Sequence, residues 1–279
     1  MTAHSPPLAG VIGWPIGHSR SPRLHGHWLS RHGIDGFYIP IGLAPEDFSR
    51  GLASLPALGF RGVNVTIPHK EAALAAASEA TDTAVRIGAA NTLTFLPDGG
   101  IHADNTDGYG FIENLRQGAP GWTAERGPAL VLGAGGASRA VIAALIDAGA
   151  PEIRLANRTR SRAEQLTEHL GGPVVVIDWD EASEATDGAA TIVNTSALGM
   201  VGQPPLDIRL DAAPAHALVS DIVYEPLITP ILAAAADRGL RVVDGLGMLL
   251  HQGVPGFARW FGETPRVDAD LRAAVLGGT

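Results

Sequence analysis

Residues 128–162 constrain the fold of this chain more than any other segment. A short apolar run from Ala129 to Leu132 precedes a glycine-rich turn, and an apolar, helix-like stretch follows from Ala140 to Ala148. A second strand-like run, from Glu152 to Ala156, ends in a polar segment rich in arginine. Glycines allow a tight turn in which backbone N–H groups at a helix N-terminus can approach a pyrophosphate. The order of strand, glycine turn, helix and strand therefore predicts a dinucleotide-binding unit.

The residues after the second strand indicate which dinucleotide is bound. NAD sites place an acidic residue there for the ribose 2′-hydroxyl, whereas this chain has Asn157, Arg158 and Thr159, with further arginines at 160 and 162. Guanidinium groups suit a dianionic 2′-phosphate, so we expect NADP. The glycine pattern alone is weak evidence, because Ser138 occupies the third glycine position. The flanking strand, helix and arginines carry the prediction.

Composition limits the remaining classes of protein. A chain of 279 residues with 46% hydrophobic residues predicts a packed core in one large or two ordinary domains. A net charge of −9 argues against a nucleic-acid partner. The lack of cysteine rules out disulfides and thiolate catalysis and fits a reducing compartment, so we expect a cytoplasmic protein. No apolar run is long enough for a membrane span, and no secretory signal is expected.

Strand and helix patterns alternate along the rest of the chain. We expect strands at 10–14, 37–41, 63–67, 92–96, 101–103, 174–177, 191–194, 218–222 and 242–243, and helices at 21–31, 45–55, 70–77, 107–117, 245–262 and 268–276. This alternation predicts an α/β fold of parallel sheets covered on both faces. Ligands of such folds bind beyond the carboxyl ends of the strands, so functional residues are expected in the loops at 15–21, 64–70, 104–107, 133–138, 157–162 and 194–200.

Polar residues in the first half suggest chemistry. Ser19 and Ser21 could hold a carboxylate beside a helix N-terminus, although Ser21 could instead only cap that helix before Pro22. Alternation places Asn64 and Thr66 on one face of a strand. Lys70 follows at the start of a helix, where the positive helix end disfavours a charged amine and suits proton transfer. A surface lysine is the alternative interpretation.

Two further groups of polar residues leave more alternatives open. Asn91 and the Asp104–Gly108 string read most simply as turns, and Asp107 could cap a helix or pair with Lys70. His25 and His27 are two apart, so they would not share a helix face, and we expect no metal site.

Eight segments in order resemble the shikimate dehydrogenase family along nearly the whole chain: VIGWPIGHSRSPRLH, GVNVTIPHK, GAANTL, DNTDG, VLGAGGASRA, NRTRSRAEQL, DIVYEPLITP and DGLGMLLHQ. The resemblance implies NADPH-dependent, reversible reduction of 3-dehydroshikimate to shikimate, in aromatic amino-acid biosynthesis. It implies an N-terminal α/β substrate domain (1–108, completed by returning terminal helices, 246–279), a C-terminal Rossmann NADP domain (109–245), and an active site between them.

The resemblance also assigns roles to residues. Lys70 matches the catalytic lysine, with Asp107 as its partner. Substrate-binding positions are matched by Ser19, Ser21, Thr66, Asn91, Asp107, Tyr224 and Gln252. Cofactor-binding positions are matched by Gly133, Ala134, Gly135, Gly136, Ala137, Ser138, Asn157, Arg158, Thr159 and Arg162, with lesser contacts from Asp82, Ile222 and Gly245. Gly26 stands where the family often has asparagine.

Three alternatives remain open. A quinate/shikimate dehydrogenase using NAD would tend to have an acid in place of Asn157 and threonine in place of Ser21. A non-catalytic NADP-sensing protein would be expected to lack Lys70 or Asp107. A folate-type dehydrogenase shares the architecture but does not need the two serines together with Gln252. Whether the chain is a monomer or a homodimer is not decided by the sequence.

Overall fold

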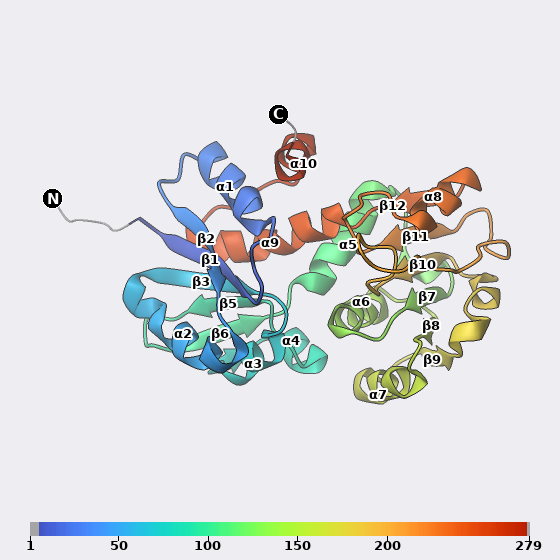
Figure 1. Cartoon of the computed structure of the whole chain (residues 1–279), viewed down its shortest axis with the longest axis horizontal. Coiled ribbons are helices and arrows are strands. Elements are labelled where there is room, and N and C mark those ends of the chain that lie inside the picture. The colour runs from blue at the N-terminus through green and yellow to red at the C-terminus, as the bar shows by residue number, and fades with distance from the viewer. Residues whose placement is uncertain (1–5, 278–279) are drawn as a thin grey trace. The chain divides into compact units, whose positions relative to one another are not determined.

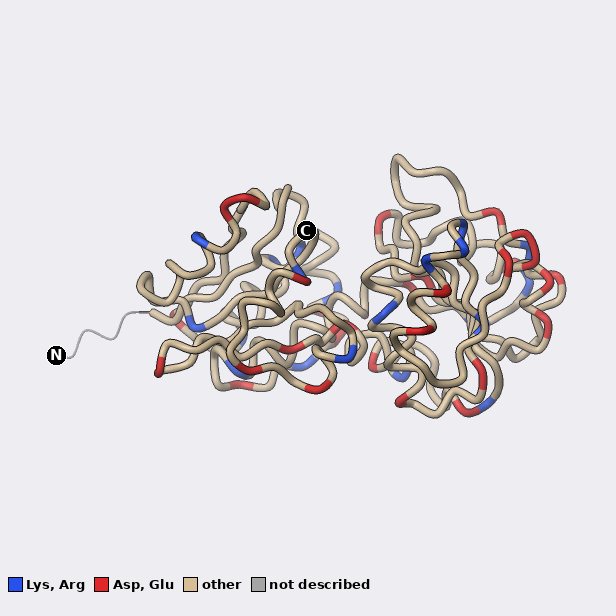
Figure 2. Tube along the Cα trace, turned by 90° about the horizontal axis from the view of Figure 1, so that it is seen from below, with Lys and Arg blue, Asp and Glu red and all other residues tan. Residues whose placement is uncertain are grey.

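The computed structural model describes residues 6–277, and it divides into two compact units, each with its own sheet (Figure 1). The first unit contains the chain up to Thr106 together with the segment from Gln252 onward, and the second runs from Asp107 to His251. The sequence placed these divisions after Gly108 and Gly245. The second division falls within a helix, so no linker marks it. Acidic and basic residues are interspersed in both units (Figure 2).

The second unit is built on a six-stranded parallel sheet in the order β9-β8-β7-β10-β11-β12. This is the Rossmann order, in which the first strand lies at the centre and the chain winds outward in both directions. Its strands are β7 (Ala129–Leu132), β8 (Ile153–Ala156), β9 (Val174–Ile177), β10 (Thr191–Asn194), β11 (Leu218–Asp221) and β12 (Arg241–Val243). Its helices are α5 (Asp107–Gly118), α6 (Gly136–Asp147), α7 (Arg160–Leu170) and α8 (Pro230–Asp237).

Both faces of this sheet are buried, because alternate strand residues belong to different apolar clusters. Val131 packs with residues of α5, α6 and α7, whereas its neighbours Leu130 and Leu132 pack with residues of α8. The strand order reverses at β7, which pairs with both β8 and β10. Ligands of doubly wound sheets bind beyond the carboxyl ends of the strands at such a point.

The first unit contains a mixed six-stranded sheet in the order β2-β1-β3-β5-β6-β4. Its strands are β1 (Leu8–Gly13), β2 (Phe37–Gly42), β3 (Phe60–Val65), β4 (Glu79–Ala80), β5 (Thr92–Phe95) and β6 (Ile101–Asp104). Its helices are α1 (Ser21–Arg31), α2 (Phe48–Ser54), α3 (Lys70–Ala75), α4 (Asp82–Ile87) and α10 (Ala269–Leu276). Helix α9 (Leu246–Phe261) contributes residues to both units.

The expectation of parallel sheets throughout is wrong for this sheet. Strand β5 runs antiparallel to both β3 and β6, because the turn at Pro97–Gly100 joins β5 and β6 as a hairpin. Because β5 is antiparallel to both of its neighbours, β6 runs in the same direction as β3 and β1. The carboxyl ends of β1, β3 and β6 and the start of β5 therefore lie at the same edge of the sheet.

Several local expectations also need correction. The strand expected at 63–67 ends at Val65, so Thr66 begins a turn, and Ile67, expected to lie in the strand, is 74% exposed. Helices α4, α7 and α8 and the short strand β4 were not predicted. Within the described range, no helix is both long and apolar enough to cross a membrane.

Candidate active site

Lys70 is the first residue of α3, at the sheet edge where the strands end, and its side chain is half-buried. It is the only lysine in the chain, since every other Lys/Arg position is arginine. Its backbone carbonyl accepts a hydrogen bond from Ala90 N at 2.9 Å. The preceding His69 is buried, with Nε2 2.7 Å from the carbonyl of Leu43 and its ring stacked on Phe48. Lys70 thus follows a firmly held residue.

Three residues from distant parts of the chain meet beside β5. Asn91 Oδ1 accepts a hydrogen bond from the backbone N–H of Thr106 at 2.9 Å and lies 3.1 Å from the Thr106 hydroxyl oxygen. Asn91 Nδ2 donates to Gln252 Oε1 at 3.3 Å, and the Thr106 hydroxyl also lies 2.8 Å from the carbonyl of Gln252. Asn91 and Gln252, predicted from resemblance to share a site, are therefore brought together, and all three residues are buried.

Asn64 and Tyr38 extend this arrangement, and neither was assigned a role from the sequence. The Tyr38 hydroxyl donates to Asn64 Oδ1 at 2.7 Å, and Asn64 Nδ2 donates to Asn91 O and to Thr92 Oγ1. Burial raises the pKa of Tyr38 well above its usual value, and a hydrogen bond with Ser21 opposes that shift. An asparagine between two valines near the end of a strand was the available sequence signal.

The two serines follow the end of β1. Ser21 is the first residue of α1 rather than its N-cap, which is Arg20, and the Ser21 backbone N–H donates to Ser19 Oγ at 3.3 Å. Ser19 Oγ, not Ser21 Oγ, thus accepts a hydrogen bond from a backbone N–H at the start of α1. Ser21 is buried, as a solvated cap would not be. We call the residues at this edge the sheet-edge cluster: Ser19, Ser21, Thr66, Lys70, Asn91, Thr106 and Gln252.

Two predicted substrate residues lie in the second unit. Asp107 directly follows Thr106 in the chain, begins α5 and is buried. Tyr224 lies in the loop between β11 and α8. That loop is anchored by the buried Asp221, whose carboxylate accepts hydrogen bonds from Asn194 Nδ2, Val223 N and the Thr229 hydroxyl. Burial raises the pKa of Asp221, and these three hydrogen bonds oppose the shift.

The glycine turn occupies the carboxyl end of β7. Gly133 has φ +115°, a conformation that favours glycine, and a Cβ there would lie 3.0 Å from the backbone N of Ser196. A Cβ added to Gly135 or Gly136 would meet nothing within 4 Å. The turn is fixed by Gly135 N donating to Ser138 Oγ, which lies 2.7 Å from Thr195 Oγ1. Thr195 was not assigned a role from the sequence.

This turn fits a pyrophosphate. The N–H groups of Gly136 and Ala137 lie in the first turn of α6, where the helix offers no carbonyl to them, and Gly136 is exposed. Ala134 N donates to Asn157 Oδ1 at 3.1 Å, so the end of β8 is tied to the turn. Asn157 Nδ2 in turn donates to the carbonyl of Thr159.

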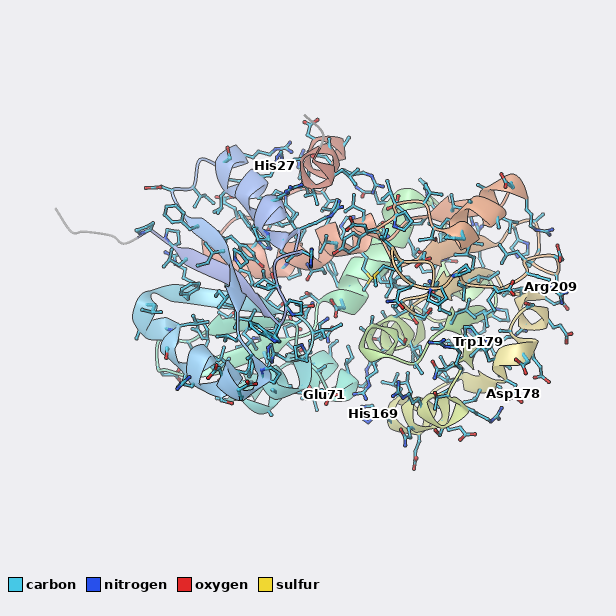
Figure 3. All side chains as sticks on the ribbon, viewed as in Figure 1. His27, Glu71, His169, Asp178, Trp179 and Arg209 are labelled. Atoms are coloured by element: carbon cyan, nitrogen blue, oxygen red, sulfur yellow. The ribbon has the colours of Figure 1, made fainter. Side chains whose placement is uncertain are left out.

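The arginines after β8 differ in their surroundings. Arg160 is paired with Glu164 on its own helix and with Asp178 after β9, so its charge is already compensated. Asp178 is labelled in Figure 3. Arg158 and Arg162 are exposed, and within residues 6–277 no hydrogen bond or ion pair engages their side chains. The residues present therefore fit a dinucleotide with a 2′-phosphate.

The lesser cofactor positions fall into two groups. Gly245 lies against the loop after β11, and a Cβ there would be 2.4 Å from the carbonyl oxygen of Ile222, so these two predicted residues are neighbours. Asp82 is exposed at the start of α4 in the first unit, whereas the glycine turn belongs to the second unit. No group of side chains suited to a metal ion is found between residues 6 and 277.

Family models match three stretches of the chain. The "Shikimate dehydrogenase substrate binding domain" matches residues 11–93, "Shikimate / quinate 5-dehydrogenase" matches 121–200, and the "Shikimate 5'-dehydrogenase C-terminal domain" matches 245–275. The shikimate dehydrogenase (NADP(+)) of Paracoccus denitrificans is 60% identical over 270 residues, covering 97% of this chain and 96% of its own length. The chain belongs to the shikimate dehydrogenase family. The enzyme of the same name from Rhodospirillum rubrum is 61% identical over 274 residues, 97% of each chain.

Solved structures of this family share the fold over the full length. Shikimate 5-dehydrogenase from Thermus thermophilus, in complex with NADP(H) and shikimate, has a TM-score of 0.86 and 37% identity, covering 98% of this chain and 99% of that one. Quinate dehydrogenase from Corynebacterium glutamicum, in complex with NAD, has a TM-score of 0.91 and 29% identity, covering 98% and 100%. The fold alone therefore does not distinguish shikimate dehydrogenases from quinate dehydrogenases. Only the residues of the site can distinguish these two activities.

Proposed function

We propose that this protein is an NADP-dependent shikimate dehydrogenase, which reversibly reduces 3-dehydroshikimate to shikimate in aromatic amino-acid biosynthesis. The observation that carries the proposal is the sheet-edge cluster, in which hydroxyl and amide groups come from five segments at the sheet edge where the only lysine of the chain begins α3. A polyhydroxylated ring acid needs such an array of neutral donors and acceptors with one basic group.

The substrate side of the proposal assigns roles by chemistry. The Ser19 and Ser21 hydroxyls would bind the carboxylate, and Thr66, Asn91 and Gln252 would bind ring hydroxyls. Asp107, next to Thr106, is the second proposed catalytic residue, since its carboxylate can accept a hydrogen bond from a ring hydroxyl. Tyr224 is proposed to contact the substrate from its loop.

The cofactor side depends on the turn after β7. When bound, NADPH supplies the hydride for the ring ketone. The N–H groups at the start of α6 would hold the pyrophosphate, Asn157 and Thr159 the adenosine end, and Arg158 and Arg162 the 2′-phosphate. Minor contacts are proposed for Asp82, Ile222 and Gly245.

Lys70 is proposed to move the proton. As the ketone becomes an alcohol, its oxygen gains negative charge, and Lys70 Nζ would donate a proton to it in reduction and take one back in the reverse direction. An arginine cannot do this near neutral pH, because it does not release its proton. A lysine in a chain that otherwise uses arginine supports this role.

NADP is favoured over NAD by charge. An NAD site uses an acid at the end of the second strand, and that acid would repel a 2′-phosphate. Here the position is Asn157, and two uncompensated arginines lie close behind it in the sequence. Quinate and NAD are therefore expected to be the poorer pair of substrates.

One assay tests the proposed activity. The purified chain is assayed for reduced nicotinamide by its near-ultraviolet absorbance, with shikimate and quinate each combined with NADP and NAD. The highest kcat/KM is expected for shikimate with NADP. Preference for quinate with NAD would show instead that the chain is a quinate dehydrogenase.

We also propose that the protein is cytoplasmic and forms a homodimer. Light scattering would test homodimer formation, and cell fractionation would test the location.

A further inference from the structure

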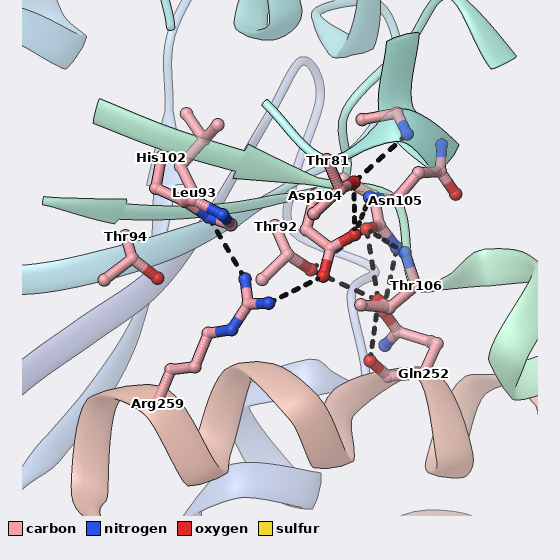
Figure 4. Close-up of polar contacts among 12 residues, drawn as sticks. Thr81, Thr92, Leu93, Thr94, His102, Asp104, Asn105, Thr106, Gln252 and Arg259 are labelled. Carbon is pink, nitrogen blue, oxygen red and sulfur yellow. Dashed lines mark hydrogen bonds and ion pairs between the residues drawn. The ribbon is translucent and has the colours of Figure 1, made fainter. Parts of the chain in front are cut away.

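A second polar network adjoins the sheet-edge cluster, on strand β6. Arg259 of α9 places its guanidinium against β6, with Nη2 3.0 Å from Asp104 Oδ2 and Nη1 3.2 Å from His102 Nδ1 (Figure 4). Because a guanidinium can only donate, His102 accepts through Nδ1 in this contact. The Asp104 side chain is only 15% exposed, and that of Arg259 is 36% exposed.

Asp104 is connected directly to the substrate side. Its other carboxylate oxygen, Oδ1, accepts hydrogen bonds from the Thr81 hydroxyl and from the backbone N–H of Asn105, both at 2.8 Å. Its backbone carbonyl accepts from Asn91 N at 3.0 Å. One residue thus holds Asn91, the loop that leads to Thr106, and the arginine of α9.

Arg259 and Gln252 lie on the same face of α9. Seven residues make almost two full turns, so their side chains project in nearly the same direction, about 10 Å apart along the axis. Pro255 lies between them and lacks the N–H that would bond to the carbonyl of His251, so the helix is weakened at this point. The part of α9 from Gln252 onward therefore depends on its own contacts with the sheet.

We propose that Arg259 is a positioning residue for the substrate, which sets the place of Gln252 and Asn91 by bridging α9 to Asp104 and His102. The bridge fixes the C-terminal part of α9 at one end, and the bond from Thr106 to the Gln252 carbonyl fixes the other. Trp260 Nε1 also ties this end of α9 to the sheet, by donating to the carbonyl of Leu93 at 3.1 Å. Loss of the Arg259 bridge would therefore loosen the 3.3 Å contact between Asn91 and Gln252 without detaching the helix. This inference rests on the proposed shikimate dehydrogenase activity.

The test uses Arg259→Met, Arg259→Lys, Asp104→Asn and the Arg259/Asp104 double variant of the full chain. Asp104→Asn retains a side-chain oxygen that can accept the hydrogen bonds from the Thr81 hydroxyl and from Asn105 N. It removes the negative charge that faces Arg259. Arg50→Met is the matched control, because Arg50 is exposed and pairs only with Asp47 among the described residues. KM for shikimate, KM for NADP, kcat and Tm are measured for each.

Arg259→Met is expected to raise KM for shikimate about tenfold, with kcat within about threefold of wild type and KM for NADP unchanged. Asp104→Asn should act in the same way, and the double variant should be no worse than the poorer single variant. Arg259→Lys should recover part of the affinity, because an ammonium can reach one partner but lacks the fork for both. The Arg50→Met variant should match wild type.

Two results would overturn the inference. One is a shikimate KM within twofold of wild type in Arg259→Met, even if Tm falls, which would leave only a structural role. The other is an equal loss of affinity for shikimate and NADP. Absence of shikimate oxidation in wild type and Arg50→Met alike would instead overturn the proposed function itself.

Discussion

The imidazole of His25 lies face to face with the ring of Tyr38, with centroids 3.8 Å apart and parallel planes, in the interior of the first unit. His25 is completely buried, and neither ring nitrogen has a hydrogen-bond partner in the described structure. Burial lowers the pKa of His25 to about 3 from its ordinary 6.5, and the neighbouring Asn64 side chain opposes this shift to a smaller extent. The folded protein thus holds this histidine neutral.

This histidine predicts acid sensitivity of folding. Between pH 6.5 and about 3 the unfolded chain binds a proton at His25 that the folded chain does not. The contribution of neutral His25 to the free energy of unfolding is therefore fully present above pH 6.5. Below pH 6.5 this contribution decreases by at most about 1.4 kcal/mol per pH unit. In His25→Phe, urea unfolding should show a shallower loss of stability across this range. His216→Gln, at an exposed histidine, should retain the wild-type slope, and an unchanged slope in His25→Phe would contradict the prediction.

Sequence patterns predicted the strands of the second unit better than those of the first. Strands β7, β9 and β10 begin and end where expected, because a parallel sheet buried on both faces is written as short apolar runs bounded by glycine and polar turns. The first sheet was expected to be parallel, and it is not. Pairing of β5 with β3 depends on contacts between distant segments, which local periodicity does not encode.

The site residues show the same limit. The string around Asp104 reads as a turn, and nothing in it indicates that Asp104 pairs with Arg259, 155 positions later in the chain. Likewise, Asn64 was recognised only as one polar side of a strand, whereas the structure makes it the link between Tyr38 and Thr92. The role of Gln252 was predicted only from the family resemblance, because no local pattern indicates that a residue so far from Ser21 in the sequence belongs to the same site.

The only lysine of the chain allows a sharp test of proton transfer. Lys70→Ala should lower kcat at least about 100-fold with a smaller effect on KM, because proton transfer occurs in the transition state. Lys70→Arg separates two roles: it keeps the charge but cannot release a proton, so it should remain as inactive as the alanine variant. Recovery of kcat by arginine would show that charge alone is needed.

Chemical modification gives an independent check on Lys70. Lys70 is the only side-chain amine in this protein that an amine-acylating reagent can modify. Acylation should abolish activity, and saturating shikimate should slow the loss. Mass spectrometry of the modified peptide around residue 70 measures the extent of reaction. Full activity after complete acylation of Lys70 would exclude the proposed role.

The unequal surroundings of the arginines after β8 predict cofactor selectivity. Replacing both Arg158 and Arg162 with glutamine should raise KM for NADP strongly while leaving weak NAD use nearly unchanged, because each lost charge-assisted contact costs about 1.5–3 kcal/mol. Arg160→Gln is the matched control, since Arg160 is already paired with Glu164 and Asp178. Initial rates with both cofactors decide the matter, and an equal weakening of NADP and NAD would show that these arginines do not recognise the phosphate.

Ser21 and Gln252 are expected to act on the same ligand with different strengths. Ser21 would bind the carboxylate of shikimate, and hydrogen bonds to a charged group contribute about 1.5–3 kcal/mol, so Ser21→Ala should weaken shikimate binding at least about tenfold. Gln252 would bind a neutral hydroxyl, for which about 0.5–1.5 kcal/mol predicts a loss of about two- to tenfold in Gln252→Ala.

Calorimetric titration of shikimate and NADP separately into each variant measures these losses. Ser30→Ala, on the exposed side of α1, is the matched control and should bind both ligands as wild type does. NADP affinity should stay unchanged in all three variants, because the glycine turn and the arginines lie in the other unit. Wild-type shikimate affinity in both Ser21→Ala and Gln252→Ala would refute the shared site, whereas a parallel loss of NADP affinity would indicate misfolding.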